Sequence, residues 1–256
     1  MASWTATQAV AQSLALDSAE PVRPDALVLL FVPDAFVDGN HFLSDQAAVM
    51  AAVRSAEPWA SLGPRLVARS VGPLPVADAA CHLEREHRLE PGLVCDRSLA
   101  DRLNALGLPA GWKLVVLSRE PFPPRATLAA PGKSSPIFLS TTWDLGATSF
   151  RHAVLHELGH AFGLRDECDL LRLPAASPAR GAGPPNCAPD RATAEQWWGD
   201  LVPPAGYIPG CGGLETAIRP TRSSFMSCGR PADGEPDGYG PVSLRYLRQA
   251  LGLHPP

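Results

Sequence analysis

The sequence predicts an α/β fold, with a mixed sheet of about four to five strands and helices followed by a loop-rich C-terminal lobe. Two observations predict this. Up to about residue 166, short apolar runs that fit buried strands alternate with segments of helical periodicity. Beyond it the composition changes, because the stretch from Pro174 to Pro241 contains 12 prolines and 11 glycines and few periodic segments. We therefore expect a layered N-terminal part and a C-terminal part dominated by loops.

Four segments are predicted to form strands: Ala26–Val32, Arg65–Val71, Leu114–Leu117 and Ile137–Thr142. The first and third are continuous apolar runs, as expected of central strands that are buried on both faces. The fourth is more polar, so we expect it to lie at the edge of the sheet.

Four helices are predicted, each with one apolar stripe. They start at Ser44, at Asp96, at Thr148 or Ser149, and at Pro241, and three of them end before Pro58, at Gly107 and at Gly252. The stripes are Val49, Met50 and Val53; Leu99, Leu103 and Leu106; Val154, Leu155, Leu158 and Phe162; and Leu244, Leu247 and Leu251. In domain terms this gives a lead-in over 1–24, an α/β subdomain over 25–166 and a loop-rich subdomain over 167–256.

Charge and hydropathy exclude two classes of partner. The chain has 256 residues and a net charge of −4, and it has no dense basic run, so it carries no electrostatic footprint for nucleic acid. The apolar run Ala26–Val32 is far too short to span a bilayer, and we expect no transmembrane segment. The oligomeric state is left open.

The six cysteines form an even set without a C-x-x-C pair. This favours three disulfides in an oxidising compartment over a cysteine-rich zinc site, with six reduced buried thiols as the alternative. Residues 1–20 lack a basic n-region, and polar residues interrupt their apolar stretch, so they do not form a signal peptide. We nevertheless expect a secreted or periplasmic protein on account of the cysteines.

The motif His156-Glu157-Leu158-Gly159-His160 predicts a metal site. On a helix, residues four apart lie on one face about one turn apart, which is the separation that Zn²⁺ needs from two imidazoles. Gly163 can adopt positive φ and turn the chain back, so that Asp166 offers a third ligand. The fourth position stays open for water, and Glu157 is placed to act on that water as general base.

Other residues near the motif have alternative interpretations. Glu167 could replace Asp166 as the ligand, although capping of the backbone or pairing with an arginine fits it better. Glu195 would be the third ligand if the protein were a zinc hydrolase of another architecture. His152 continues the i, i+4 series back from the motif and is interpreted as a cleft-lining or a structural histidine.

The pattern His156-Glu157-x-x-His160-x-x-Gly163-x-x-Asp166 resembles the metzincin clan of zinc peptidases, in the variant with aspartate as third ligand. Within this clan the sequence is most similar to the IgA-peptidase-like family. The likeness is strong over about 150–230, and over 26–142 it extends only to the order of strands and helices. It rests further on Asp166-Glu167, Trp197-Trp198-Gly199-Asp200-Leu201, Gly210-Cys211, Arg219-Pro220-Thr221 and Tyr239-Gly240-Pro241-Val242.

The resemblance implies a twisted, metzincin-like sheet and one catalytic zinc ion. It implies that Met226 forms the turn beneath the zinc, and that a peptide substrate binds as an extended strand along Ile137–Thr142. Tyr207 is a weak substitute for the tyrosine that stabilises the transition state in some relatives. The disulfide pairing that fits the resemblance is Cys81–Cys95, Cys187–Cys211 and Cys168–Cys228.

The expected function is therefore zinc-dependent hydrolysis of peptide bonds in proteins, by a metalloendopeptidase. Two alternatives stay open: a zinc hydrolase outside the metzincins, and an inactive secreted binding module on a peptidase scaffold. The sequence does not specify the natural substrate or the cleavage preference.

Overall fold

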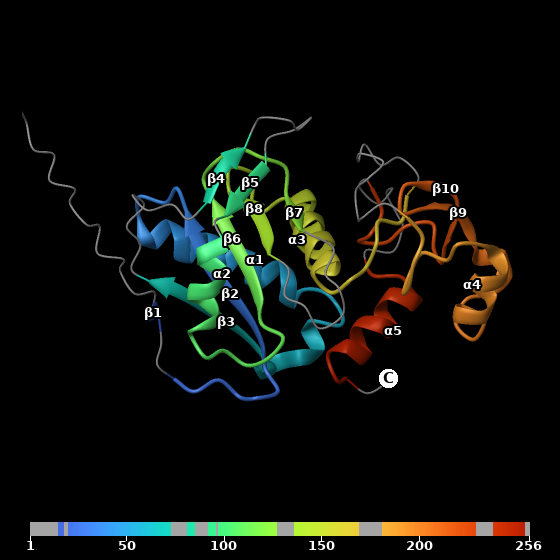
Figure 1. Cartoon of the computed structure of the whole chain (residues 1–256), viewed down its shortest axis with the longest axis horizontal. Helices are drawn as coiled ribbons and strands as arrows, with labels where there is room; N and C mark the ends of the chain where they lie inside the picture. Colours follow the sequence, from blue (N-terminus) through green and yellow to red (C-terminus); the bar gives the residue numbers. More distant parts are fainter. Residues whose placement is uncertain are drawn as a thin grey trace, which may run out of the picture.

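The computed structural model describes residues 15–17, 20–72, 81–84, 92–95, 97–126, 136–168, 181–228 and 238–253. Its centre is a mixed sheet with the strand order β1-β3-β2-β6-β8-β7 (Figure 1). The strands are β1 (Ala15–Leu16), β2 (Leu27–Asp34), β3 (Leu66–Gly72), β6 (Lys113–Ser118), β7 (Arg125–Ala126) and β8 (Ile137–Ser140). The α/β class is confirmed, and the sheet has six strands because two short ones join its edges.

The four inner strands are parallel, and the two-residue strands β1 and β7 pair antiparallel at the edges. Strand β2 lies between β3 and β6, so that Leu29 pairs with Ala68 on one side and Lys113 on the other. Strands of two residues leave no periodic pattern in a sequence, which is why neither was predicted. β1 also lies within 1–24, so part of the expected lead-in belongs to the sheet.

The apolar run of β2 is buried because helices cover both faces of the sheet. Leu29 and Phe31 pack in one cluster with residues of α1 (Gly39–Arg54) and α3 (Thr148–Ala161). Leu30 and Val32 pack in a second cluster with Leu99 and Leu103 of α2 (Arg97–Asn104). The continuous run thus reflects a strand with no solvent-facing side.

The start of α1 corrects one prediction. The helix begins at Gly39 rather than after Ser44, because Asp38 accepts a hydrogen bond from the amide of Asn40 at 2.9 Å and acts as the N-cap. Ser44 therefore lies inside the helix. Asp96, the predicted cap of α2, lies outside the described residues, and Gly107 beyond α2 has the positive φ of 67° expected at a helix end.

The predicted edge strand is wrong. β8 pairs with β6 on one side and with β7 on the other, through Arg125 with Phe138 and Ala126 with Ile137, and all four residues of β8 are buried. Within the described part of the chain β7 is the outermost strand on this side. The chain returns antiparallel after β6 and covers the start of β8, a pairing that the polar character of 137–142 does not reveal.

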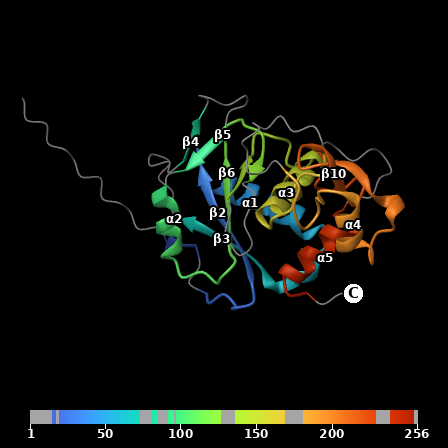
Figure 2. The same cartoon turned by 45° about the vertical axis from the view of Figure 1, so that its right-hand side comes forward.

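Beyond Asp166 the chain contains more regular structure than predicted. It forms α4 (Arg191–Trp198), capped by Asp190, a 3₁₀ turn at Pro204–Gly206, and a hairpin of β9 (Ile208–Cys211) and β10 (Leu214–Arg219). The predicted last helix is confirmed as α5 (Pro241–Ala250), with proline in its first turn. Figures 1 and 2 show α4 and the hairpin on the side of α3 away from the sheet.

Three disulfides are present: Cys81–Cys95, Cys168–Cys228 and Cys187–Cys211, the same pairs that the resemblance implied. The first joins two short strands that form a separate hairpin, β4 (Cys81–Glu84) and β5 (Gly92–Cys95). The other two lie in the C-terminal part. A small apolar cluster around Trp198 and Tyr207 packs between α4 and the β9–β10 hairpin.

The two parts of the chain share one core across residue 166. Phe225, Met226, Tyr239, Leu247 and Leu251 belong to the same buried cluster as the sheet, α1 and α3. The hydroxyl of Tyr239 accepts from the Trp59 indole at 3.3 Å and donates to the carbonyl of Leu155 at 2.5 Å. The segment around Met226 and helix α5 are therefore built onto the metal-motif helix rather than set apart from it.

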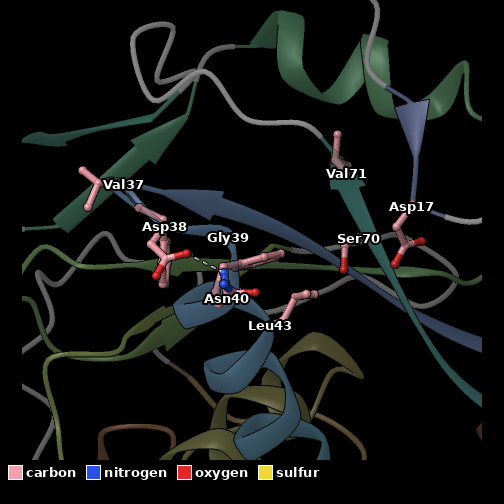
Figure 3. A pocket seen from close by; sticks show the side chains of 10 residues that line it. Asp17, Val37, Asp38, Gly39, Asn40, Leu43, Ser70 and Val71 are labelled. Carbon is pink, nitrogen blue, oxygen red and sulfur yellow. Dashed lines mark hydrogen bonds between the residues drawn. The ribbon is translucent and has the colours of Figure 1, made fainter.

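A pocket of about 460 Å³ opens beside the start of α1, between the β2–α1 connection and the end of β3 (Figure 3). Val37 and Leu43 are exposed at this pocket, and Asp17 and Asp38 are its carboxylates. None of its residues belongs to the metal-capable cluster described below. Over the described ranges, no helix is long and apolar enough to cross a bilayer.

Candidate metal centre

Helix α3 presents His156 and His160 on one face. Their Nε2 atoms lie 3.0 Å apart, and the two rings are nearly perpendicular. Each ring is held from behind by its other nitrogen: Nδ1 of His156 lies 2.8 Å from the carbonyl oxygen of Phe225, and Nδ1 of His160 lies 2.8 Å from that of Leu164. Because a carbonyl only accepts, both Nδ1 atoms carry hydrogen, and both Nε2 atoms present a lone pair in the neutral rings.

Gly163 brings the third side chain to this point. The helix ends with amides of Gly163 and Leu164 bonded to the carbonyls of His160 and Gly159, and Gly163 has a φ of 94°, which a residue with a side chain rarely adopts. The chain turns back, and Oδ1 of Asp166 lies 3.1 Å from Nε2 of His156 and 3.3 Å from Nε2 of His160. The sequence-predicted set of His156, His160 and Asp166 is therefore brought together.

This geometry fits a divalent cation. Three atoms that carry lone pairs converge, which is repulsive unless a cation lies between them. Tetrahedral bonds of ~2.0–2.1 Å to zinc would place any two ligand atoms about 3.3–3.4 Å apart, close to the distances given above. Two histidines and one carboxylate leave one position of a tetrahedron open, the pattern of a catalytic rather than a structural zinc site.

The charges of Asp166 and His156 shift each other's pKa values. Burial by itself would lower the pKa of His156, but the hydrogen bond to Asp166 and the charges of Glu157 and Asp166 raise it to about 9. Burial would raise the pKa of Asp166, but the two histidines hold it well below its usual range. The carboxylate is therefore ionised and attracts positive charge, whether a proton or a metal ion, to the point between the rings.

Glu157 lies beside this point without joining the cluster. It is 7% exposed, and burial raises its pKa although both histidines act in the opposite direction. The backbone amide of Ala126, in the edge strand β7, donates a hydrogen bond to its carboxylate. A buried carboxylate with a raised pKa accepts a proton more readily than an exposed one, as suits a general base.

The turn at Ser224–Ser227 lies directly behind the helix. Met226 is fully buried, and a Cβ atom at Gly159 would collide with its sulfur, so the glycine in the middle of the motif allows the close approach of the turn. The turn also supplies the Phe225 carbonyl that orients His156. Met226 therefore packs directly against the helix that carries the two histidines.

The remaining candidates lie elsewhere. The ring of His152 packs against those of His156 and Phe225, one turn before the ligands. Tyr207 is buried against Trp198 in the C-terminal apolar cluster, and Glu195 is exposed on α4. Glu167 is fully buried and accepts hydrogen bonds from other side chains, so it does not take the place of Asp166 in the cluster.

Sequence reasoning missed three contributors to this site. They are the carbonyls of Phe225 and Leu164 and the amide of Ala126. Backbone groups of this kind have no sequence signal, because every residue except proline has both an amide and a carbonyl. No protein-family model matches the chain, and no curated protein is significantly similar to it.

Proposed function

We propose that the protein is a zinc-dependent endopeptidase in which His156, His160 and Asp166 bind one zinc ion and Glu157 is the general base. One observation carries the proposal: three lone-pair donors converge in a buried site, and the carboxylate of Glu157 lies beside them without taking part. This donor set matches that of catalytic zinc sites. The resemblance of the motif to the metzincin clan supports the same conclusion.

When bound, zinc would polarise the scissile carbonyl and make water acidic enough to act as a nucleophile near neutral pH. Glu157 accepts a proton from the attacking water and returns it to the nitrogen of the leaving amine as the C–N bond breaks. Because burial raises its pKa, Glu157 accepts that proton more readily than an exposed carboxylate would. The Phe225 and Leu164 carbonyls keep both imidazoles in the tautomer that presents Nε2.

The substrate class follows from the edge strand beside the base. We propose that an extended peptide adds to the outer side of β7, because the amide of Ala126 is bonded to Glu157 and the strand therefore runs past the reacting groups. This replaces the expected binding along 137–142. The three disulfides support a secreted or periplasmic location for the reaction.

The test is metal analysis combined with cleavage of casein or a denatured protein. The native protein should carry one zinc ion per chain and cleave the substrate, and a chelator should abolish cleavage. Glu157→Gln should keep its zinc and lose about 10²–10⁴-fold in rate. Asp166→Asn should lose zinc, whereas Glu195→Gln, on the exposed face of α4, should change neither property. A zinc-loaded native protein that cleaves no faster than Glu157→Gln would instead be a binding module.

A further inference from the structure

A second carboxylate, Glu167, is fully buried next to the ligand Asp166 and is not used by the proposed mechanism. Its Oε1 accepts hydrogen bonds from the amide of Asn186 at 3.0 Å and the hydroxyl of Ser243 at 3.3 Å, and its Oε2 accepts from the hydroxyl of Ser224 at 2.7 Å. These donors come from three segments: the loop before α4, the turn that contains Met226, and helix α5. One side chain thus joins the segment that carries Asp166 to three other parts of the molecule.

The first contact controls the segment that carries Asp166. The Asn186 side chain accepts from the backbone amide of Arg165 at 2.9 Å and donates to its carbonyl at 2.8 Å. The orientation of this amide group is fixed by its second donation, which goes to Glu167. The backbone immediately before Asp166 is therefore held through Asn186, and the carbonyl of Asp166 is held by the amide of Gly212 at 2.8 Å.

The second contact controls His156. The Ser224 hydroxyl donates to Glu167 and at the same time accepts from the amide of Met226 at 3.0 Å, which shapes the turn. The backbone amide of Glu167 donates to the carbonyl of Met226 at 2.7 Å and closes the same turn from the other side. The residue between Ser224 and Met226 is Phe225, whose carbonyl fixes the ring of His156.

We infer that Glu167 is a positioning residue that sets the geometry of two metal ligands at once, Asp166 through Asn186 and His156 through Ser224. The inference rests on the proposed metal site and concerns how that site is assembled. A carboxyl group suits the position because it offers two acceptor oxygens, and the three side chains that hydrogen-bond to it are donors. A side chain without acceptors would leave three buried donors without their partner. The segments that position Asp166 and His156 would then relax.

The experiment measures cobalt(II) binding to the metal-stripped protein by its visible absorption, which reports ligand number and geometry independently of catalysis. Glu167→Met preserves volume and removes both acceptors. It should weaken cobalt binding by about 10–100-fold, as is typical for loss of a partner that orients a ligand, and should change the absorption band. Glu167→Gln keeps one oxygen for Asn186 and should retain most of the affinity. Asn186→Ala and Ser224→Ala should each reproduce part of the loss.

The matched control is Asp34→Leu. Asp34 is another buried carboxylate, which accepts from the hydroxyl of Ser118 at 2.5 Å and has no hydrogen bond to the ligand segment. It should reduce stability to a similar degree and leave cobalt binding unchanged. Circular dichroism and a thiol titration establish that each variant is folded with its disulfides formed.

If native protein binds cobalt and folded Glu167→Met binds it within twofold of native with the same spectrum, the positioning role is refuted while the metal site stands. A Glu167→Met variant that fails to fold leaves the decision to Asn186→Ala and Ser224→Ala, and unchanged binding in both also refutes it. If native protein binds neither cobalt nor zinc, the proposed function itself is overturned, and the positioning role with it.

Discussion

The two parts of the chain that meet at the metal centre are stabilised in different ways. The α/β layer is held by apolar burial on both faces of the sheet, with β2 in the middle. The segment 181–218 has two small apolar clusters and the internal disulfide Cys187–Cys211, and the side chain of Asn186 ties it to Glu167. The disulfide Cys168–Cys228 joins the residues just after Asp166 to the segment that follows Met226. Helix α3 of the layer carries the two histidines, and Asp166 follows it at the boundary between the two parts, so the proposed site depends on both kinds of stabilisation.

This difference shows which of the proposed ligands is held less firmly. The histidines stand on a helix packed into the main core, and their spacing is fixed by the helix itself. Asp166 lies beyond the helix, at the start of the part that depends on cross-links and hydrogen bonds. Changes in the lobe should therefore alter metal binding more than equally destabilising changes in the layer.

The largest expected effect comes from opening a disulfide. Cys168–Cys228 spans a sequence separation of 60 residues, and replacing both cysteines by serine should cost about 4 kcal/mol of unfolding free energy and weaken metal binding. Removing Cys81–Cys95, with a separation of 14 residues, should cost about 3 kcal/mol and leave metal binding unchanged. Denaturant unfolding and zinc titration of both double variants check this. Equal loss of zinc affinity in the two would contradict the comparison.

Replacing Asp166, the proposed ligand that adjoins the lobe, is the next largest change. Asp166→Ala should weaken zinc binding by about a hundredfold or more, about 2.7 kcal/mol, because two imidazoles alone remain. The control is Asp190→Ala, which removes the N-cap of α4 in the same lobe and should cost about 1 kcal/mol of stability without affecting zinc. Competition with a coloured chelator measures both, and a similar affinity in the two variants would argue against Asp166 as ligand.

Gly159→Ala tests the contact between the layer and the turn. The added methyl group would collide with the Met226 sulfur, so the turn must shift, at a cost of about 1–3 kcal/mol. Combining it with Met226→Ala should recover part of that loss, because the smaller side chain makes room. Gly39→Ala, where nothing lies within 4 Å of the new Cβ, should be nearly neutral. Thermal unfolding of Gly159→Ala, Met226→Ala, the double variant and Gly39→Ala tests this. If the losses of stability in Gly159→Ala and Met226→Ala simply add in the double variant, the contact is excluded.

Lys113 gives the smallest expected effect and lies wholly in the layer. It is buried in β6 with its ammonium 4.5 Å from the centre of the Phe162 ring, and burial lowers its pKa from 10.5 to about 8. The unfolded chain binds more protons between these values, so unfolding free energy should rise from pH 8 to pH 10.5. Lys113→Met should remove this rise and add about 1 kcal/mol at pH 7, since the cation–π contact offsets part of the burial cost. An unchanged pH dependence in the variant would show that other groups cause it.

Much of the layer could be predicted because its determinants are local. The apolar run that became β2, the stripe of α3 and the first-turn proline of α5 are patterns that neighbouring residues create together. The errors have different causes. Asp38 rather than Ser44 caps α1 through a local hydrogen bond from the amide of Asn40. β7 rather than β8 forms the edge because a separate segment of the chain pairs with β8.

The sequence by itself determined which side chains can meet at the metal centre: a helix spaces His156 and His160, and Gly163 turns the chain so that Asp166 follows within reach. Only the tertiary structure decided how those side chains are held. The Phe225 carbonyl, the Ala126 amide and the donors around Glu167 come from segments far away in the chain. Their contribution depends on where the backbone lies, and residue type alone does not specify that position.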